Sequence, residues 1–384
     1  MTWTLHRRWV ASVAAGSLLV ALLASHSAAA GSADSAGLRA IVQVDAAAQL
    51  RVERHHLRFG QNVTLTARLV EVGTGDGIGG EEVVLQARRR GTDNWRPIAS
   101  RQTEVGGRAL WTRHPDATFR YRVLHTATPE YSRALSPARE VAVSPLVTAN
   151  LNKSWARQSG SAAVHGRVRP GFQGDPVVLQ RRVDGAWHRV GSDHQNAEGQ
   201  YRIRVGGWVH RGSYRYRVVV PATTDHALAT SKRLSLDVVR LVTYQIETRG
   251  RIVASMQTFR ERVAEIYADR RGWSRAYVHF KRLKSGADFS VVLAQAREVP
   301  KFAPICDSYY SCRVGRYVII NQDRWRFGTP YFRSAGGTMQ QYRAMVVDHE
   351  TGHWFGLGHA TCTNPGGPAP VMMQQSKGLH GCEP

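Results

Sequence analysis

Cysteine, lysine and long apolar runs are scarce in this chain. These scarcities argue, in turn, against a lipid anchor, a nucleic-acid partner and a membrane span. No cysteine precedes Cys306, so we expect no lipid anchor attached through a thiol near the N-terminus. After residue 30 no segment is apolar enough to cross a bilayer, which takes about 20 residues. Lysine stands at scattered positions such as Lys153 and Lys232 and forms no basic run. With no recognisable nucleic-acid motif either, we expect no nucleic-acid partner.

Arginine is abundant instead, and it supplies most of the formal charge of +23. A G+C-rich, bacterial coding sequence would produce part of this excess, and most of these side chains are expected on a solvated surface. An excess of cations also attracts anionic surfaces, and anionic cell-wall polymers are the obvious extracellular candidates.

The N-terminus predicts export. Arg7 and Arg8 precede an apolar run over 9–24, and small residues follow at 28–30. This order is typical of a secretory signal peptide, here residues 1–30, cleaved after Ala30. An uncleaved anchor is the weaker alternative, because the apolar run is short for a membrane span. We therefore expect a secreted protein, associated with the cell wall if the arginines bind it.

Two segments then repeat one pattern with a period of roughly 94 residues, too long for a solenoid repeat. VVLQ occurs at 83–86 and again at 177–180, and YRV occurs at 121–123 and again at 216–218. Trp95 and Trp187 also correspond. Within each copy apolar and polar residues alternate in short runs separated by Gly, Asp and Asn turns. The pattern predicts two tandem all-β sandwiches of the immunoglobulin-like type over 31–144 and 145–240, with the arginines on the solvated faces.

The pattern changes over 241–384. A strand at 241–247 precedes a helix with apolar residues at helical spacing over 252–267. Strand-like runs follow at 276–283, 288–294 and 317–325, and a second helix begins near Met339. These segments predict a mixed α+β domain as the third unit.

All four cysteines belong to this last unit, and an exported chain meets an oxidising environment, so two disulfides are expected. Three pairings are possible. We favour the local one, Cys306 with Cys312 and Cys362 with Cys382, because it brackets a short hairpin and the chain end. A zinc knuckle is the competing interpretation, but the C-x2-4-C repeats of such sites are missing.

The stretch HETGHWFGLGH at 349–359 predicts a metal site. Residues four apart lie on one helix face, so His349 and His353 can bind the same ion, with Glu350 beside it. Gly356 allows the helix to end, and His359 can then supply a third ligand. Three imidazoles leave a fourth position open, as in a catalytic zinc site. The extended motif fixes five residues in eleven, which makes a chance match a poor explanation.

This motif, followed by PVMM at 370–373, resembles the zinc motif and Met-turn of the metzincin clan of metallopeptidases. The segment from about Tyr244 to Cys382 is similar to a secreted actinobacterial family of zinc-dependent peptidases. The resemblance implies a metzincin-like catalytic domain over 241–384, a zinc cofactor, a peptide or protein substrate, and Met372 as the Met-turn methionine, with Met373 as the runner-up. Gln374 stands where some members have a metal-approaching tyrosine.

The resemblance leads to a main hypothesis and two alternatives. The main one is a secreted zinc endopeptidase in which Glu350 takes a proton from a zinc-activated water. Cleavage of wall cross-bridges shares this chemistry and differs only in substrate. The alternative from another class is a non-catalytic cell-wall or protein-binding adhesion module that retains a zinc site. No oxyanion donor is evident, although four side chains could assist: Tyr309, Tyr310, Gln374 and His380.

Overall fold

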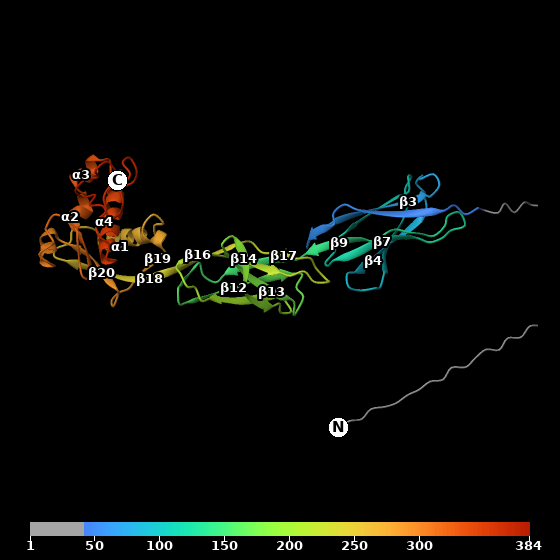
Figure 1. Ribbon diagram of the computed structural model, residues 1–384, viewed down its shortest axis with the longest axis horizontal. Helices are drawn as coiled ribbons and strands as arrows, with labels where there is room; N and C mark the ends of the chain where they lie inside the picture. Colours follow the sequence, from blue (N-terminus) through green and yellow to red (C-terminus); the bar gives the residue numbers. More distant parts are fainter. Residues whose placement is uncertain (1–41) are drawn as a thin grey trace, which may run out of the picture.

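The computed structural model describes residues 42–384, so the expected signal peptide lies outside the described residues. The chain forms three parts in a row along its longest axis, two strand-rich parts followed by a part that carries the helices (Figure 1). Within the described range no helix is both long and apolar enough to cross a membrane.

The first part is a sandwich of two sheets. One sheet has the strand order β1-β3-β6, and the other has the order β2-β9-β7-β4-β5, with the short β8 paired to β7. Buried and exposed residues alternate along β3, where Val63, Leu65, Ala67 and Leu69 point into a core shared by both sheets. The period-two pattern therefore marks the inward face, as expected. The strands are β1 (Ala46–Val52), β2 (His56–Arg58), β3 (Val63–Glu71), β4 (Glu82–Arg89), β5 (Arg96–Gln102), β6 (Arg108–Arg113), β7 (Phe119–His125), β8 (Ala134–Leu135) and β9 (Arg139–Ser144).

The second part repeats this sandwich, with one sheet in the order β10-β12-β15 and the facing sheet containing β14, β13, β16 and β18. It has its own core, in which Tyr201, Ile203 and Val205 alternate with exposed residues along β15. The strands are β10 (Leu146–Leu151), β11 (Trp155–Arg157), β12 (Ser161–Arg169), β13 (Pro176–Val183), β14 (Ala186–His194), β15 (Gln200–Gly206), β16 (Gly212–Val220), β17 (Ala229–Thr230) and β18 (Leu234–Arg249).

Residues that recur in both copies of the repeat form the same outward-facing cluster in each sandwich. Arg122 Nε donates to Gln86 Oε1 at 2.8 Å, and its guanidinium lies 4.1 Å from the Trp95 ring centroid. In the second copy Arg217 Nε donates to Gln180 Oε1 at 2.8 Å, and the guanidinium lies 4.5 Å from the ring centroid of the corresponding tryptophan. The repeat therefore encodes a solvated Gln–Arg–Trp stack as well as a core.

The two sandwiches meet through backbone hydrogen bonds. The Thr118 amide donates to the Asp225 carbonyl at 2.7 Å, and the Ala227 amide donates to the Val143 carbonyl at 2.8 Å. An ion pair between Arg89 and the Asp225 carboxylate adds to this junction. The loop after β16 thus docks onto the first sandwich by main-chain contacts.

Strand β18 joins the second sandwich to the C-terminal part without a break. Its first half pairs with β16 over 234–238, and its second half pairs in parallel with β20 over 244–249. The result is a ten-stranded sheet: seven strands follow the order β14-β13-β16-β18-β20-β22-β21, and β11, β17 and β19 pair with strands of this series. The added strands are β19 (Val278–Arg282), β20 (Phe289–Ala294), β21 (Cys312–Val314) and β22 (Tyr317–Asn321).

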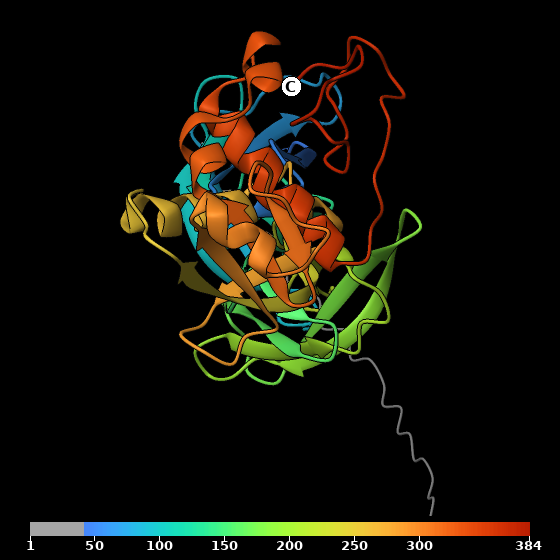
Figure 2. The ribbon, with the colours of Figure 1, turned by 90° about the vertical axis from the view of Figure 1, so that its left-hand side faces the viewer.

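Helices cover one face of the parallel strands. Phe259 of α1 and Tyr342 of α4 share a buried cluster with Tyr244, Phe289 and Ile320 of the sheet. The opposite face packs against η2 and the loop near Cys306, so every residue of β20 is buried, as is usual for a central parallel strand. In the end-on view the helices and the C-terminal tail face the viewer, and the strands of the second sandwich lie below them (Figure 2). The helices are α1 (Met256–Ala268), η1 (Trp273–Ala276), η2 (Ala296–Lys301), α2 (Gln322–Phe327), α3 (Pro330–Ser334) and α4 (Met339–Trp354).

The predicted fold class is wrong for its third unit, the α+β metzincin-like domain. Of the described residues, 44% lie in strands and 15% in helices, and no separate α+β catalytic domain of the metzincin type is present among them. The reason is β18, which runs through residue 240 and places sandwich strands and C-terminal strands in one sheet. The predicted domain boundaries stay predictions.

The strand predicted over 317–325 is also partly wrong. It ends at Asn321, whose side chain accepts a hydrogen bond from the Asp323 amide at 2.9 Å and caps α2. An asparagine in this position favours a helix start, which outweighs the apolar pattern. The predicted helices near 252–267 and from Met339 are present as α1 and α4.

Candidate metal centre and adjoining cavity

Helix α4 places two of the three histidines. It begins at a capping box, in which the Gln341 amide donates to Thr338 Oγ1 at 3.2 Å and the Thr338 amide donates to Gln341 Oε1 at 2.9 Å. One side of the helix is buried against the sheet, and the next turn carries His349, Glu350 and His353. The cap and the core therefore fix the axis along which the motif projects.

The end of α4 brings in the third histidine. Gly356 has φ +88°, a conformation that side-chain-bearing residues rarely adopt. The Leu357 amide donates to the Gly352 carbonyl at 3.0 Å, which closes the helix in a Schellman-like turn. The chain then reverses, and the Ala360 amide donates to the Met372 carbonyl at 2.9 Å. This bond anchors His359 opposite the helix.

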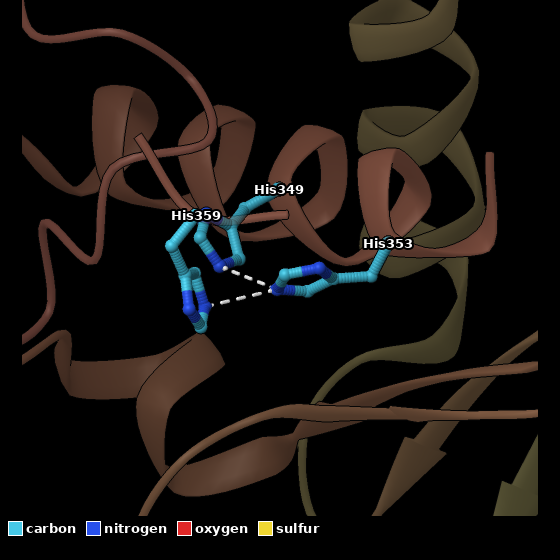
Figure 3. Close-up of side chains that lie close together, drawn as sticks. All are labelled: His349, His353 and His359. Carbon is cyan, nitrogen blue, oxygen red and sulfur yellow. Dashed lines mark hydrogen bonds between the residues drawn. The ribbon is translucent and has the colours of Figure 1, made fainter. Parts of the chain in front are cut away.

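The three imidazoles converge through their Nε2 atoms (Figure 3). His353 Nε2 lies 3.1 Å from His349 Nε2 and 3.1 Å from His359 Nε2. His349 Nδ1 donates to the Val371 carbonyl at 2.9 Å, and His353 Nδ1 donates to the Leu357 carbonyl at 2.8 Å. A carbonyl can only accept, so these Nδ1 atoms carry the protons and the two Nε2 atoms of the neutral rings present lone pairs.

This arrangement passes a fit test for a metal ion. Lone pairs of facing Nε2 atoms repel one another unless a cation lies between them. Two nitrogens bound at ~2.0–2.1 Å to one tetrahedral ion stand about 3.4 Å apart, close to the observed separations. Nδ1–H bonds to carbonyls are also the usual outer partners of ligating histidines. The donor set of His349, His353 and His359 therefore fits zinc.

A cavity of about 420 Å³ opens beside the histidines. Glu350 lines it and is 7% exposed, and burial raises the pKa of this carboxyl to about 8, an effect that Arg313 opposes. Burial also lowers the pKa of His349 to about 4, which favours the neutral ring that a metal requires. The neighbouring Asp348 is buried, and its pKa is raised to about 8 by burial.

Methionines pack beneath the helix. Met372 and Met373 are both buried, and Met373 lines the cavity. The Met372 sulfur lies against Gly352, where a Cβ would overlap it, so the helix needs glycine one residue before His353. The assignment of Met372 as a Met-turn residue stays a prediction, but its contact with the histidine helix is direct.

Both disulfides of the expected local pairing are present. Cys306 joins Cys312 at the start of β21, and Cys362 joins Cys382, which ties the chain after His359 to the C-terminus. Tyr310 and Gln374, two of the four proposed oxyanion helpers, line the cavity, whereas Tyr309 and His380 are not among its lining residues.

Sequence reasoning missed both cationic residues of the cavity lining, Arg313 and Lys377. Lys377 belongs to no motif, and Arg313 ends the YSCR stretch at 310–313, which by itself indicates no role. The only sequence signal is indirect, since Arg313 directly follows Cys312 and the disulfide fixes the strand on which it stands.

The C-terminal part of the chain is similar to one family of proteins. Residues 204–383, just under half of the chain, match a family model described as a protein of unknown function, DUF3152. A comparison with curated proteins found no match. The match begins within β15, so it includes β16 and the whole of β18 together with the three histidines.

Several structural neighbours are domains of adhesins or adhesion proteins. The D0–D1 domain of intimin has a TM-score of 0.21 at 11% identity and covers 50% of this chain and 98% of that one. InvE of Yersinia pseudotuberculosis has a TM-score of 0.27 at 11% identity, over 50% of this chain and 59% of that one. A tetra-tandem repeat of a large adhesion protein has 0.29 at 12%, over 52% and 51%. Scores this low carry no functional argument.

These findings correct the predicted identity. Neither the family match nor the neighbours indicate a peptidase family or a metzincin fold, and the matched family has no described activity. The assignments as a metzincin, a metalloprotease and a hydrolase are therefore withdrawn.

Proposed function

We propose that the protein is an exported, non-catalytic binding module for a protein ligand, and that it holds zinc through His349, His353 and His359. The observation that carries the proposal is the convergence of three Nε2 atoms, two of them with Nδ1 bonded to a backbone carbonyl. Zinc held in this way would act as a Lewis acid and offer an open coordination position to a ligand.

The surroundings support binding. The cavity gives a ligand access to the histidines, and the two sandwiches extend the chain away from it (Figure 1). The adhesin-type neighbours are compatible with a protein partner and an extracellular place, although their low scores leave the proposal to stand on the site itself.

The metal can be tested on the mature chain. Zinc content after dialysis should be about one per chain, and His353→Gln should weaken zinc binding by roughly 10–100-fold or more, because one of three ligands is lost. His380→Gln is the matched control, since His380 is exposed and lies outside the cavity lining. Equal zinc content in His353→Gln and the parent would overturn the metal assignment.

The absence of catalysis is tested with the same preparations. Unfolded casein and a quenched peptide library should survive incubation with the zinc-loaded chain. Cleavage that disappears in Glu350→Gln, with zinc still bound, would contradict the non-catalytic assignment.

A further inference from the structure

Two cationic side chains line the cavity beside the histidines, Arg313 on β21 and Lys377 on the C-terminal segment. Arg313 is half-buried, and its Nε is shielded from solvent without a hydrogen-bond partner among the described residues. Lys377 Nζ lies 5.4 Å from the Tyr310 ring centroid. Across residues 42–384 neither cation forms a salt bridge.

Neither acidic residue of the cavity forms an ion pair with these cations in the described part of the chain, although the charge of Arg313 acts on Glu350 at longer range. Asp307 Oδ1 already accepts hydrogen bonds from the amides of Tyr309 and Tyr310, at 2.7 and 2.8 Å. Glu350 is almost fully buried and makes no ion pair within 4.0 Å in the described part of the chain. Three histidines holding a divalent ion would add further positive charge. The cavity therefore favours an anionic guest.

The geometry of the arginine side chain indicates which kind of anionic ligand the cavity would bind. A guanidinium presents its N–H groups as a planar fork that matches the two oxygens of a carboxylate. A buried donor without a partner is unfavourable, so a ligand oxygen that reaches Arg313 gains more than it would at an exposed arginine. Lysine supplies a second, mobile cation at the same cavity.

We propose that Arg313 and Lys377 bind a carboxylate group of the protein ligand in this cavity, next to the histidine centre. This inference rests on the proposed binding function and specifies its ligand chemistry. The carboxylate comes either from an acidic side chain or from a chain terminus, and the two sources are distinguished by the test below.

The test uses the zinc-loaded mature chain and four peptides carrying an N-terminal 7-methoxycoumarin-4-acetyl group, a fluorophore without an ionisable group. Their sequence is Ala-Gly-Ala followed by glutamate or glutamine, each with a free or an amidated C-terminus. Fluorescence anisotropy gives the affinity for each peptide. A peptide that carries the recognised carboxylate should bind at least about tenfold more tightly than the neutral glutamine amide, because a charge-assisted hydrogen bond is stronger than a neutral one. Loss of affinity on amidation identifies a terminal carboxylate, and loss on the change to glutamine identifies a side chain.

Variants test whether the affinity for the peptides depends on Arg313 and Lys377. Arg313→Gln should weaken the preferred peptide about tenfold, and Lys377→Gln, at an exposed position where folding is undisturbed, should weaken it several-fold. Arg297→Gln is the control, since Arg297 is exposed and outside the cavity. Zinc content and the thermal midpoint are measured for every variant.

The outcomes separate the two proposals. If zinc is bound but Arg313→Gln and Lys377→Gln both leave peptide affinity unchanged, or all four peptides bind equally or not at all, the carboxylate inference is overturned while the metal assignment stands. If the parent chain holds no zinc, the proposed function fails independently of peptide binding.

Discussion

Replacing Gly352 with alanine should destabilise the histidine centre, although alanine is the better helix former. The intrinsic gain is about 1 kcal/mol. Against it, the new methyl group would overlap the Met372 sulfur and come within 2.9 Å of Trp273 Cζ2. Overpacking of this kind typically lowers the free energy of unfolding by about 1–3 kcal/mol.

The sulfur has little freedom to move away. Met372 is buried, its carbonyl accepts from the Ala360 amide, and the preceding Val371 carbonyl accepts from His349 Nδ1. We therefore take the upper part of that range, about 2–3 kcal/mol, and subtract the helix gain of about 1 kcal/mol, which gives a net destabilisation of about 1–2 kcal/mol for Gly352→Ala. A shift of Val371 should also weaken zinc binding by roughly 10–100-fold, because a bonded partner of a ligand is displaced.

Urea unfolding of the metal-free chain and zinc competition with a chromophoric chelator measure these two effects. Gly358→Ala is the matched control, since a Cβ there meets nothing within 4 Å. In a double-mutant cycle, Met372→Ala should be less harmful in the Gly352→Ala background than alone, because it removes the overlapping sulfur. A Gly352→Ala chain as stable as the control, with parental zinc affinity, would refute the packing argument.

Two further predictions concern other parts of the C-terminal half. Cys362→Ser with Cys382→Ser should lower the unfolding free energy by about 3 kcal/mol, as expected for a closed loop of this length, and urea unfolding with and without zinc measures it; an unchanged midpoint would contradict a structural role for this bridge. His279 is partly buried and stacks on Trp155 with ring centroids 4.1 Å apart, and burial lowers its pKa. Below about pH 6.5 and down to the depressed pKa the unfolded chain binds more protons at this residue than the folded chain, so stability falls as pH falls. His279→Gln should make the thermal midpoint less sensitive to pH in that window, and identical pH profiles for variant and parent would exclude the effect.

The sequence predicts local structure here better than it predicts connectivity. Alternation of apolar residues identifies the inward faces of both sandwiches, because burial on one face imposes a period of two wherever the strand lies. The same alternation cannot tell which strands will be neighbours. The sequence predicts separate strands before and after residue 240. In the structure these residues form a single strand, β18, which is bonded to β16 and to β20.

The residues of the candidate site likewise fall into two groups, those that a local sequence pattern predicts and those that it does not. The spacing of His349, His353 and His359 suffices to predict their convergence, since helix geometry and one glycine turn determine it. Arg313 and Lys377 come from separate segments and reach the cavity through tertiary packing, which no local pattern records. The family resemblance failed for a related reason, because a short motif constrains only the segment that carries it.

The uninterrupted course of β18 determines how the molecule responds to a pulling force. Sixteen residues of extended chain span about 50 Å, with no loop at which the two halves could bend. Tension applied along the strand, between the sandwiches and a ligand in the cavity, loads its flanking hydrogen bonds in shear. Bonds loaded in shear must break together, whereas bonds at a peeled edge break one after another. The three-histidine cluster is thus attached to the sandwiches by a stiff mechanical connection, one that would keep its orientation while under load.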